Sequence, residues 1–412
     1  MNISLSTPSL LVRKSLQIIL ILIVVFFSSC KNKQKQYTEE ELRQKALDIC
    51  ENNIIIDSHI DWPEWILAFP EDISEKTQKG DFDLVRANKG GLNAALSVMY
   101  ISSDYNVEGG RKMVDSMFNL IKSYPKKYPG KFALARNPDD IRKNFSRKLF
   151  SLPVCLENGS PIGNDIDYLK KLKDMGIVYL TLCHNKTNQI SDSNFDTLNK
   201  KWKGLSPFGI KVINELNQLG IMVDISHSTD STVFQALRYS KAPVIASHSS
   251  CRYFVPGYER NLSDTLIKAV AKKNGVVMIN FGSMFLDSIC KRNTEDAEKW
   301  LTTNKVDIYS KEGGEYLQEY IKTHKVFSDS KRIADHIDHI VKIAGIDYVG
   351  LGSDFDGVGP TQPSDVPDVS GYPVIVYELL KRGYSEKDIK KILSGNFLRV
   401  WNDVIEIASF LN

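Results

Sequence analysis

The chain has 412 residues, of which 25% are charged and 42% are hydrophobic, and its formal net charge is +3 at pH 7. This composition argues against global disorder, and a small charge without a long basic block argues against a nucleic-acid-binding surface. The length suffices for one large α/β domain or two ordinary ones.

Residues 1–30 have the features of a secretory signal. Two basic residues precede the apolar segment Ser15–Phe27, which is shorter than the ~20 residues of a membrane-spanning helix. Small residues then precede a single cysteine, which is typical of a bacterial lipoprotein signal in which Cys30 becomes lipidated. An uncleaved membrane anchor is the alternative. Both interpretations place the rest of the chain outside the cytoplasm, and the polar residues 31–37 are expected to form a tether.

Short apolar runs rich in Val, Ile and Leu predict eight strands buried on both faces. The expected strands are Ile54–His59, Ala94–Ile101, Leu149–Glu157, Ile177–His184, Ile221–His227, Pro243–His248, Val276–Phe281 and Tyr348–Asp354. The expected helices are residues 38–50, opened by a capping box at Thr38, then Asp165–Met175, Pro207–Leu219, Asp230–Tyr239, Ser263–Lys273, Lys331–Ala344 and most of Val374–Leu411.

This alternation predicts one TIM-type (β/α)8 barrel over residues 38–412. Two stretches do not fit the alternation. Pro125–Asn144 is basic and rich in turn residues, and we expect no strand or helix from it. Leu286–Ser330 is long and charged, and we interpret it as an insertion on the catalytic side of the barrel, between the last two strands.

Polar side chains that bind metals or move protons recur at the carboxyl ends of these strands, which is where parallel barrels place their active sites. The first is the pair His59 and Asp61, which point to the same side of an extended chain and can hold one cation. Taken alone, such a pair is more often a pair of solvated loop residues. Its place at the end of a buried strand favours a metal.

Glu157 ends the third expected strand. A carboxylate that emerges from the core needs a partner, and it can bridge two divalent ions with one oxygen on each. An ion pair with a lysine or arginine is the alternative. His227 and His248 each follow a serine at the ends of two consecutive strands, and imidazoles in such positions can share a zinc ion. A hydrogen-bonded structural role is the alternative for each histidine alone.

These five residues make two candidate sites that share Glu157: one with His59 and Asp61, the other with His227 and His248. Mixed imidazole and carboxylate ligands favour zinc, with manganese or cobalt as alternatives. Two cations held in this way can activate water and polarise a substrate carbonyl.

Three further residues are candidates for catalysis or substrate binding. Asp354 ends the last strand and can move a proton between a water molecule and a leaving amine. His184 can donate a hydrogen bond to the substrate carbonyl or developing oxyanion, and a structural hydrogen bond is its alternative. Arg260 can hold a substrate carboxylate with two hydrogen bonds, and a surface ion pair is its alternative.

Some residues of the same types are expected to be structural. Cys155 and Cys183 lie in expected strands and are interpreted as small core residues, and the cysteine spacing gives no disulfide framework. His336 and His339 lie on the helix before the last strand. We expect both to be structural or surface residues, toward the side of the barrel opposite the strand ends.

In order along the chain, these motifs resemble the membrane (renal) dipeptidase family, peptidase family M19. The matching segments are Asp57–Asp61, Tyr179–Asn185, Val223–His227, Pro243–Ser249, Arg260–Leu262, Ala334–Ile340 with Gly345–Asp347, Gly352–Gly357 and Gly395–Trp401. The resemblance implies a barrel of the metal-dependent hydrolase superfamily, two zinc ions per chain, a homodimer, and cleavage of dipeptides with a free C-terminal carboxylate, including D-residues at that position.

Residue by residue, the resemblance implies that His59, Asp61, Glu157, His227 and His248 are the zinc ligands. It also implies that His184 and Arg260 bind substrate and that Asp354 transfers the proton. The chain departs from the family at Ser58, Ile60 and Asn158, where Gly, Asn and Gly are usual, and its segment 286–330 is larger than in mammalian members. These changes bear on the substrate range.

The expected function is therefore that of a membrane-tethered, extracytoplasmic di-zinc dipeptidase without a nucleic-acid partner. In one alternative, the same metal site hydrolyses N-acyl amino acids, lactams or lactones in place of dipeptides. A second is a solute-binding lipoprotein that keeps the pocket without catalysis.

Overall fold

The computed structural model describes residues 37–308 and 310–412, and the described residues divide between two units at the boundary of Leu42 and Arg43. The expected signal, with Cys30, and the expected tether up to residue 36 lie outside the described residues. At the end of the first unit, the backbone N–H of Thr38 donates to Glu41 Oε2 (2.8 Å) and that of Glu41 donates to Thr38 Oγ1 (3.2 Å), which confirms the capping box. Within the described ranges, no helix has the length and apolar composition needed to cross a membrane.

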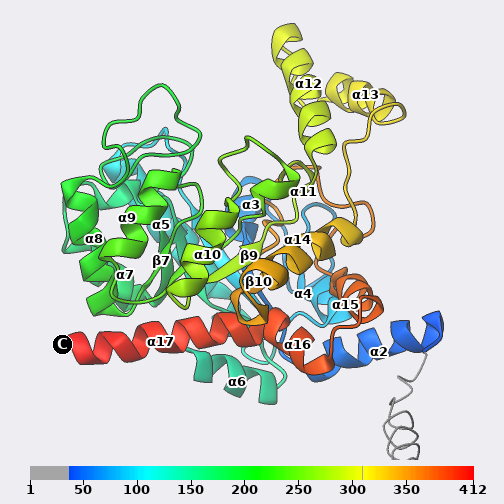
Figure 1. Ribbon diagram of the computed structural model, residues 1–412, viewed down its shortest axis with the longest axis horizontal. Coiled ribbons are helices and arrows are strands. Elements are labelled where there is room, and N and C mark those ends of the chain that lie inside the picture. The colour runs from blue at the N-terminus through cyan, green and yellow to red at the C-terminus, as the bar shows by residue number, and fades with distance from the viewer. Residues whose placement is uncertain (1–36, 309) are drawn as a thin grey trace, which may run out of the picture. The chain divides into compact units, whose positions relative to one another are not determined.

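Strands and helices alternate through the second unit (Figure 1). The strands are β1 Ile56–Ile60, β2 Ala94–Tyr100, β3 Phe132–Leu134, β4 Phe150–Leu152, β5 Val154–Glu157, β6 Ile177–Thr181, β7 Met222–Asp224, β8 Val244–Ala246, β9 Val276–Ile279 and β10 Val349–Leu351. The helices are α2 Glu39–Asn52, α3 Trp62–Ala68, α4 Leu84–Gly90, α5 Val107–Lys127, α6 Pro138–Ser146, α7 Tyr168–Met175, α8 Pro207–Leu219, α9 Asp230–Tyr239, α10 Asp264–Lys272, α11 Ser283–Leu286, α12 Ser288–Asn304, α13 Lys311–Tyr320, α14 Ser330–Ile343, α15 Tyr372–Lys381, α16 Glu386–Lys390 and α17 Asn396–Leu411.

Eight of the strands form a parallel ring in the order β1-β2-β5-β6-β7-β8-β9-β10. A parallel bridge between Ile60 and Phe355 joins the end of β1 to the chain that follows β10. Asp61 N–H donates to the carbonyl of Phe355 (2.9 Å), and Asp354 N–H donates to that of His59 (3.0 Å). These bonds close the sheet, and the predicted TIM-type (β/α)8 barrel is confirmed.

The third expected strand is divided in two. Pro153 separates β4 from β5, because proline has no N–H to donate to a strand ladder, although its carbonyl accepts from Ser97 N–H (2.7 Å). Only β5 belongs to the ring. β4 pairs with β2 and with β3, outside the ring. The prediction of a single strand over Leu149–Glu157 was therefore wrong at the proline.

The turn-rich Pro125–Asn144, from which no strand or helix was expected, contains the end of α5, all of β3 and most of α6. Both helices begin at an asparagine cap. Asn106 accepts from Gly109 N–H at the start of α5, and Asn137 accepts from Asp140 N–H at the start of α6. The two asparagine caps are sequence signals of helix starts, and the composition of the stretch alone does not reveal them.

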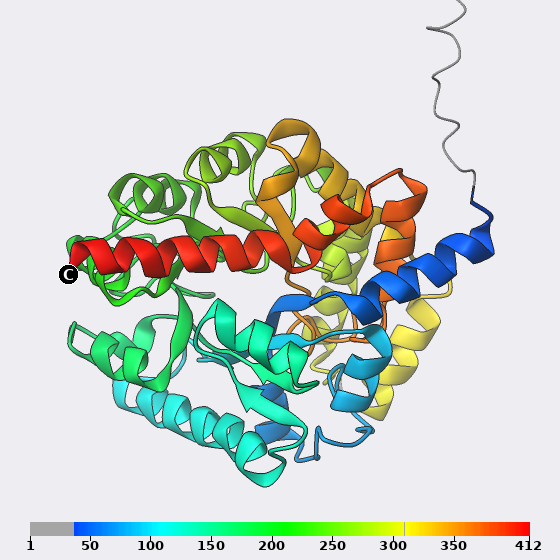
Figure 2. The ribbon, with the colours of Figure 1, turned by 90° about the horizontal axis from the view of Figure 1, so that it is seen from below.

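Helix α17 crosses one end of the barrel (Figure 2). Its apolar face places Phe397, Trp401 and Val404 in one buried cluster with strand residues such as Ile56 and Met222. The predicted helical tail is confirmed, and it closes the end of the barrel that lies opposite the carboxyl ends of the strands.

Segment 286–330 contains the two helices α12 and α13, which project from the barrel in Figure 1. They contact each other through the stacked rings of Trp300 and Tyr316, whose centroids are 3.8 Å apart. Ala297 and Leu301 form part of the buried face of α12.

Candidate metal centre and catalytic cavity

The candidate site residues lie where the barrel strands end. His59 is in β1, Asp61 is the N-cap of α3, and Glu157 is the last residue of β5. His227 and His248 follow β7 and β8 within three residues. The expected strands therefore extended a little too far, since the chain has already left the ladder when it reaches these histidines.

Two of the turns have unusual backbone geometry. His227 and Asp354 have φ of 64° and 66°, a left-handed conformation that is uncommon for residues other than glycine. Such conformations persist where the surrounding contacts fix them, and they cluster at functional sites.

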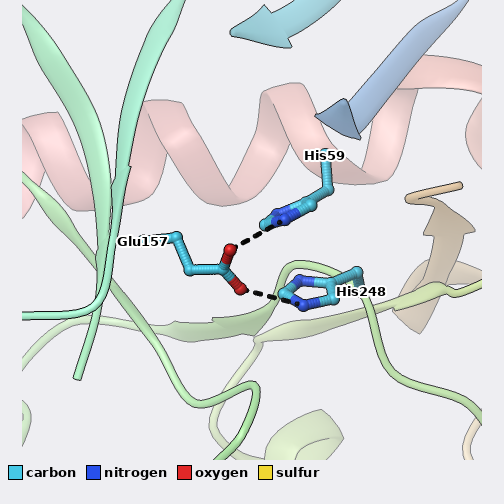
Figure 3. A group of neighbouring side chains, drawn as sticks. All are labelled: His59, Glu157 and His248. Carbon is cyan, nitrogen blue, oxygen red and sulfur yellow. Dashed lines mark ion pairs between the residues drawn. The ribbon is translucent and has the colours of Figure 1, made fainter. Parts of the chain in front are cut away.

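Glu157 stands between two groups of side chains (Figure 3). Its Oε2 atom is 3.5 Å from His59 Nε2, and its Oε1 atom is 3.2 Å from His248 Nε2 and 3.1 Å from His227 Nε2. The carboxylate is 3% exposed, so each oxygen faces a different set of buried nitrogen atoms. This is the arrangement that a bridging carboxylate requires.

The first group, here called the carboxylate half, contains His59, Asp61 and Asp354. His59 Nε2 lies 3.5 Å from Asp61 Oδ2 and 3.8 Å from Asp354 Oδ1. The other oxygen of Asp354 accepts a hydrogen bond from Asn280 Nδ2 (2.7 Å). A Cβ atom at Gly357 would lie 2.3 Å from Asp61 Oδ2 and 2.5 Å from Asp354 Oδ1, so this close packing requires glycine there.

The second group, here called the imidazole half, contains His227 and His248. Their Nε2 atoms are 2.9 Å apart, and both face Glu157 Oε1. Both side chains are buried. Two imidazole nitrogens and one carboxylate oxygen that converge in this way are a ligand set typical of zinc.

The two halves differ in their electrostatics. Burial lowers the pKa of His59, but the charge of Glu157 and other carboxylates outweighs it, and the pKa is raised overall. Burial and the charges of Glu157 and Asp354 raise the pKa of Asp61 well above its ordinary value. Burial and the charge of Arg260 lower the pKa of His227 well below its ordinary value. The carboxylate half thus lacks positive charge, whereas the imidazole half offers neutral ligands.

Hydrogen bonds behind the donors orient them. Tyr179 Oη donates to the carbonyl of Ser58 (3.0 Å) and lies 2.7 Å from His59 Nδ1. Because the tyrosine proton is used in the first bond, His59 Nδ1 carries the proton in the second, and Nε2 is left with a free lone pair toward the site.

A second chain of bonds supports the imidazole half. His248 Nδ1 lies 2.7 Å from Ser247 Oγ, which donates to Asp224 Oδ2 (2.6 Å). Asp224 is fully buried, and Thr181 Oγ1 donates to the same oxygen (2.5 Å). Because the Ser247 hydroxyl donates its hydrogen bond to Asp224, its oxygen accepts one from His248 Nδ1–H. His248 Nε2 is then again free to bind a cation.

The donor set fits divalent metal ions. Among the described residues, His59 Nε2, Asp61 Oδ1 and Glu157 Oε1 are buried without a hydrogen-bond partner. Three groups of potential ligand atoms lie within 4.8 Å of one another: His59 with Glu157 and His248, Glu157 with His184 and His227, and His59 with Asp61 and Asp354. Buried polar atoms without hydrogen bonds are costly unless an ion engages them, so the residues present suit bound cations.

His184 lies beside the imidazole half. Its ring centroid is 4.1 Å from that of His227, and its Nε2 atom is 3.9 Å from Glu157 Oε1, which is too far for a hydrogen bond. Burial lowers its pKa to about 4, so the imidazole is neutral at physiological pH. Besides the substrate-binding role expected from the sequence, its position also permits a ligand role next to His227.

Arg260 is buried against the imidazole half. Its Nη2 atom donates to the carbonyl of His248 (2.9 Å) and lies 3.1 Å from His227 Nε2, and its Nη1 atom donates to Ser249 Oγ (2.9 Å). It is 2% exposed, and it forms no ion pair with any carboxylate in the described residues. The surface ion pair that was its alternative is therefore absent from the described part of the chain.

Five of the candidate residues, Asp61, Glu157, His184, His227 and Asp354, line a cavity of about 380 Å³. Its other lining residues include Tyr100, Phe195, Phe285 and three further acids, Glu64, Glu298 and Asp356. Burial and the charge of Glu157 raise the pKa of Glu64 to about 7. The sequence analysis did not identify Glu64, although it lies one helical turn after Asp61.

Residues 43–412 match the family described as membrane dipeptidase (peptidase family M19). The chain belongs to this family. It is therefore a metallodipeptidase, and the resemblance stated from its sequence motifs is confirmed.

This M19 chain is 30% identical over 379 residues to Dipeptidase verJ of Clonostachys rogersoniana, with 88% of this chain and 87% of that protein covered. The probable dipeptidase PvdM from Pseudomonas aeruginosa has a similar crystal structure, with a TM-score of 0.77, 25% identity, and coverage of 89% of this chain and 99% of that chain. A metallo peptidase from Rhodobacter sphaeroides, liganded with a phosphinate mimic of the dipeptide L-Ala-D-Ala, has the same fold (TM-score 0.72, 21% identity, coverage 85% and 99%).

Two histidines of this M19 chain lie outside the cavity. His336 is buried, accepts from Cys251 N–H through Nδ1 (2.9 Å), and contacts the carbonyl of Leu286 through Nε2 (3.0 Å). His339 contacts Asp264. Their structural role is confirmed. The expectation that His336 lies toward the opposite side of the barrel was wrong, because its partners belong to the loops after β8 and β9, on the side of the site.

The predicted core role of Cys155 and Cys183 is confirmed. Cys50, Cys155, Cys183, Cys251 and Cys290 are all buried and free. Cys155 lies in β5, and Cys183 follows β6, as expected for small core residues.

Proposed function

We propose that the chain is a di-zinc dipeptidase that cleaves dipeptides with a free C-terminal carboxylate, including those with a D-residue at that position. The observation that carries this proposal is the buried guanidinium of Arg260. It lies directly beside the donor cluster, and no carboxylate among the described residues forms an ion pair with it.

A buried arginine without an anionic partner is costly, since its charge has lost its solvation and has only neutral hydrogen-bond acceptors in exchange. A substrate carboxylate would supply the missing negative charge and accept two parallel hydrogen bonds from the planar guanidinium. Because Arg260 lies against His227, a carboxylate held there would be close to the cleaved bond. We therefore propose that one residue follows the cleaved bond on the carboxyl-terminal side of the substrate.

The acids in the cavity support a free amino group at the other end of the substrate. Glu64 forms no ion pair with a described basic residue, and it lines the cavity together with Asp61. An ammonium group near Glu64 would stabilise its charged form, whereas an N-acyl group would leave this carboxylate without a partner. This observation favours dipeptides over the N-acyl amino acids of the alternative function.

Two zinc ions are proposed as the cofactors. His59, Asp61 and Glu157 would hold one ion, and Glu157, His227 and His248 would hold the other. When bound, such ions activate water for attack and polarise the carbonyl of the substrate.

The remaining roles belong to side chains of the chain itself. Asp354 accepts a proton on Oδ1, which faces the carboxylate half, and delivers it to the leaving amine, while Asn280 fixes the orientation of Oδ2. His184 is a neutral imidazole and donates a hydrogen bond to the carbonyl oxygen as negative charge develops there. Phe195 and Phe285 line the same cavity and reduce the access of bulk water.

The test is an assay of the zinc-loaded protein on Gly-D-Ala and Gly-L-Ala beside N-acetyl-D-alanine, a lactam and a lactone. We expect hydrolysis of both dipeptides, its loss on chelation and its return on addition of zinc. Hydrolysis of the acylated amino acid alone would support the alternative function. Peptide binding without products, measured by isothermal titration, would support the solute-binding alternative.

We also propose that the protein is an extracytoplasmic lipoprotein. The proposal rests on the sequence of residues 1–30, with Cys30 as the lipidated residue and residues 31–37 as the tether to the barrel. Metabolic labelling with a radioactive fatty acid should mark the wild-type chain and not Cys30→Ser. A homodimer is the proposed assembly, by the family resemblance, and light scattering on the purified protein measures it.

A further inference from the structure

A second cavity, of about 450 Å³, adjoins the catalytic cavity and is lined mainly by apolar side chains of segment 286–330 and of the loop after β10. We propose that this annex binds a large apolar side chain on the amino-terminal residue of the substrate. The inference rests on the proposed dipeptidase function and names the substrate class that this chain prefers.

The walls of the annex come from segment 286–330 and the loop after β10. Ala297 and Leu301 line it from α12, Leu317 lines it from α13, and Val326 lines it from the segment that connects α13 to α14. Ala297, Leu301 and Val326 are buried, at 3%, 5% and 8% exposure. A space of this size lined by apolar groups favours an aliphatic or aromatic group over a charged one.

The annex and the catalytic cavity share part of their lining. Glu298 of α12 and Val358 of the loop after β10 border both spaces. The two spaces therefore meet at Val358, and a side chain that extends past Val358 from the reacting centre reaches the apolar walls of the annex.

The position of the annex along the substrate follows from the two halves of the site. Arg260, the proposed carboxylate anchor, contacts His227 of the imidazole half. Val358 follows Gly357, which packs against Asp61 and Asp354 of the carboxylate half. A dipeptide with its carboxylate at Arg260 and its cleaved bond between the halves therefore has its amino-terminal residue beside Val358.

The test compares kcat/KM of the zinc-loaded full chain for Gly-D-Ala, Leu-D-Ala and Phe-D-Ala. Each added apolar contact in a fitted pocket contributes about tenfold, so we expect Leu-D-Ala and Phe-D-Ala to exceed Gly-D-Ala by at least about that factor. Ala297→Phe, which fills the annex, should lower kcat/KM for the two larger substrates about tenfold and leave Gly-D-Ala unchanged. Lys299→Phe, on the exposed face of the same helix, is the matched control and should change none of the three.

Equal kcat/KM values for the three substrates, or equal changes in kcat/KM in Ala297→Phe and Lys299→Phe, would overturn the proposed role of the annex. The dipeptidase function would remain in place. Hydrolysis of none of the dipeptides by the wild-type protein would overturn both. If Ala297→Phe does not fold, Leu317→Asn makes the same wall polar, and it should reduce the preference for Leu-D-Ala over Gly-D-Ala in the same direction.

Discussion

The two halves of the site use different chemistry around one shared carboxylate. The carboxylate half gathers His59, Asp61 and Asp354. Burial together with the neighbouring negative charges raises the pKa of Asp61, and these charges raise the pKa of His59 against the effect of burial. The imidazole half gathers His227 and His248 beside Arg260, and burial keeps both imidazoles neutral.

The difference indicates that the groups on the two sides of Glu157 have different functions. The acidic half suits cations and protons, and the proposed proton carrier, Asp354, belongs to it. The other half contains the unpaired guanidinium, which suits an anion. A zwitterionic substrate laid across the two halves would meet the opposite charge at each end. The predictions below separate the halves, in order of decreasing effect.

Removing one ligand from either half should have the largest effect. His59→Ala and His227→Ala should each lose one zinc ion and lower kcat/KM about a thousandfold, because a metal ion contributes several kcal/mol to stabilising the transition state. Metal analysis and steady-state kinetics on Gly-D-Ala measure both changes. His339→Ala, outside the cavity, is the control. Wild-type activity in either ligand variant would contradict the two-half arrangement.

Arg260→Lys should lower kcat/KM about a hundredfold, because a lysine cannot form the two parallel bonds and the partner charge is left poorly paired. The loss should fall mainly on KM. With a dipeptide whose carboxyl group is amidated, wild type and variant should be equally poor. If the variant loses as much on the amide as on the free acid, Arg260 does not recognise the carboxylate.

The hydrogen bonds behind the ligands should have smaller effects, each confined to its own half. Tyr179→Phe should weaken zinc binding at the carboxylate half about tenfold, and Ser247→Ala should do so at the imidazole half. The halves are measured separately by combining Tyr179→Phe with His227→Ala, and Ser247→Ala with His59→Ala, in chelator competition. Affinities that do not change would mean that these bonds serve packing only.

The smallest expected effect concerns stability away from the metals. Burial lowers the pKa of His336 to about 3, so the folded chain keeps this imidazole neutral where the unfolded chain protonates it, below about pH 6.5. The stability that it contributes is complete above that pH and is lost as the pH falls. Between pH 7 and pH 5 the loss should be about 2 kcal/mol.

His336→Gln keeps groups that can accept from Cys251 and donate to Leu286, but it does not titrate. Its free energy of unfolding in urea should therefore fall about 2 kcal/mol less than that of wild type over this pH range. An identical pH dependence in both proteins would assign the acid sensitivity to other groups.

Much of the site could be predicted from the sequence, because buried strands and donor side chains follow each other in a simple order. His59, Glu157 and His248 were found in this way, since a polar side chain at the carboxyl end of a buried strand of a parallel barrel indicates a functional site. Their convergence could be expected because parallel strands end at one rim of a barrel.

The supporting residues could not be found in this way. Tyr179 and Asp224 lie inside apolar strands. In such a strand a tyrosine is interpreted as a core residue, and a single acidic residue does not change the prediction of a buried strand. Their partners, Ser58 and Ser247, come from other strands, so the pairing exists only after the barrel closes. The helices of segment 286–330 were missed for another reason. Their apolar faces line a cavity, and the strong charge of their outer faces dominates the composition.

The most direct test of the shared carboxylate is a titration of the metal-free protein with zinc, compared with Glu157→Gln. We expect two tightly bound ions per chain in wild type and the loss of tight binding at both positions in the variant, while circular dichroism shows that the variant keeps its fold. Two tightly bound ions in Glu157→Gln, or a single ion in wild type, would contradict this expectation.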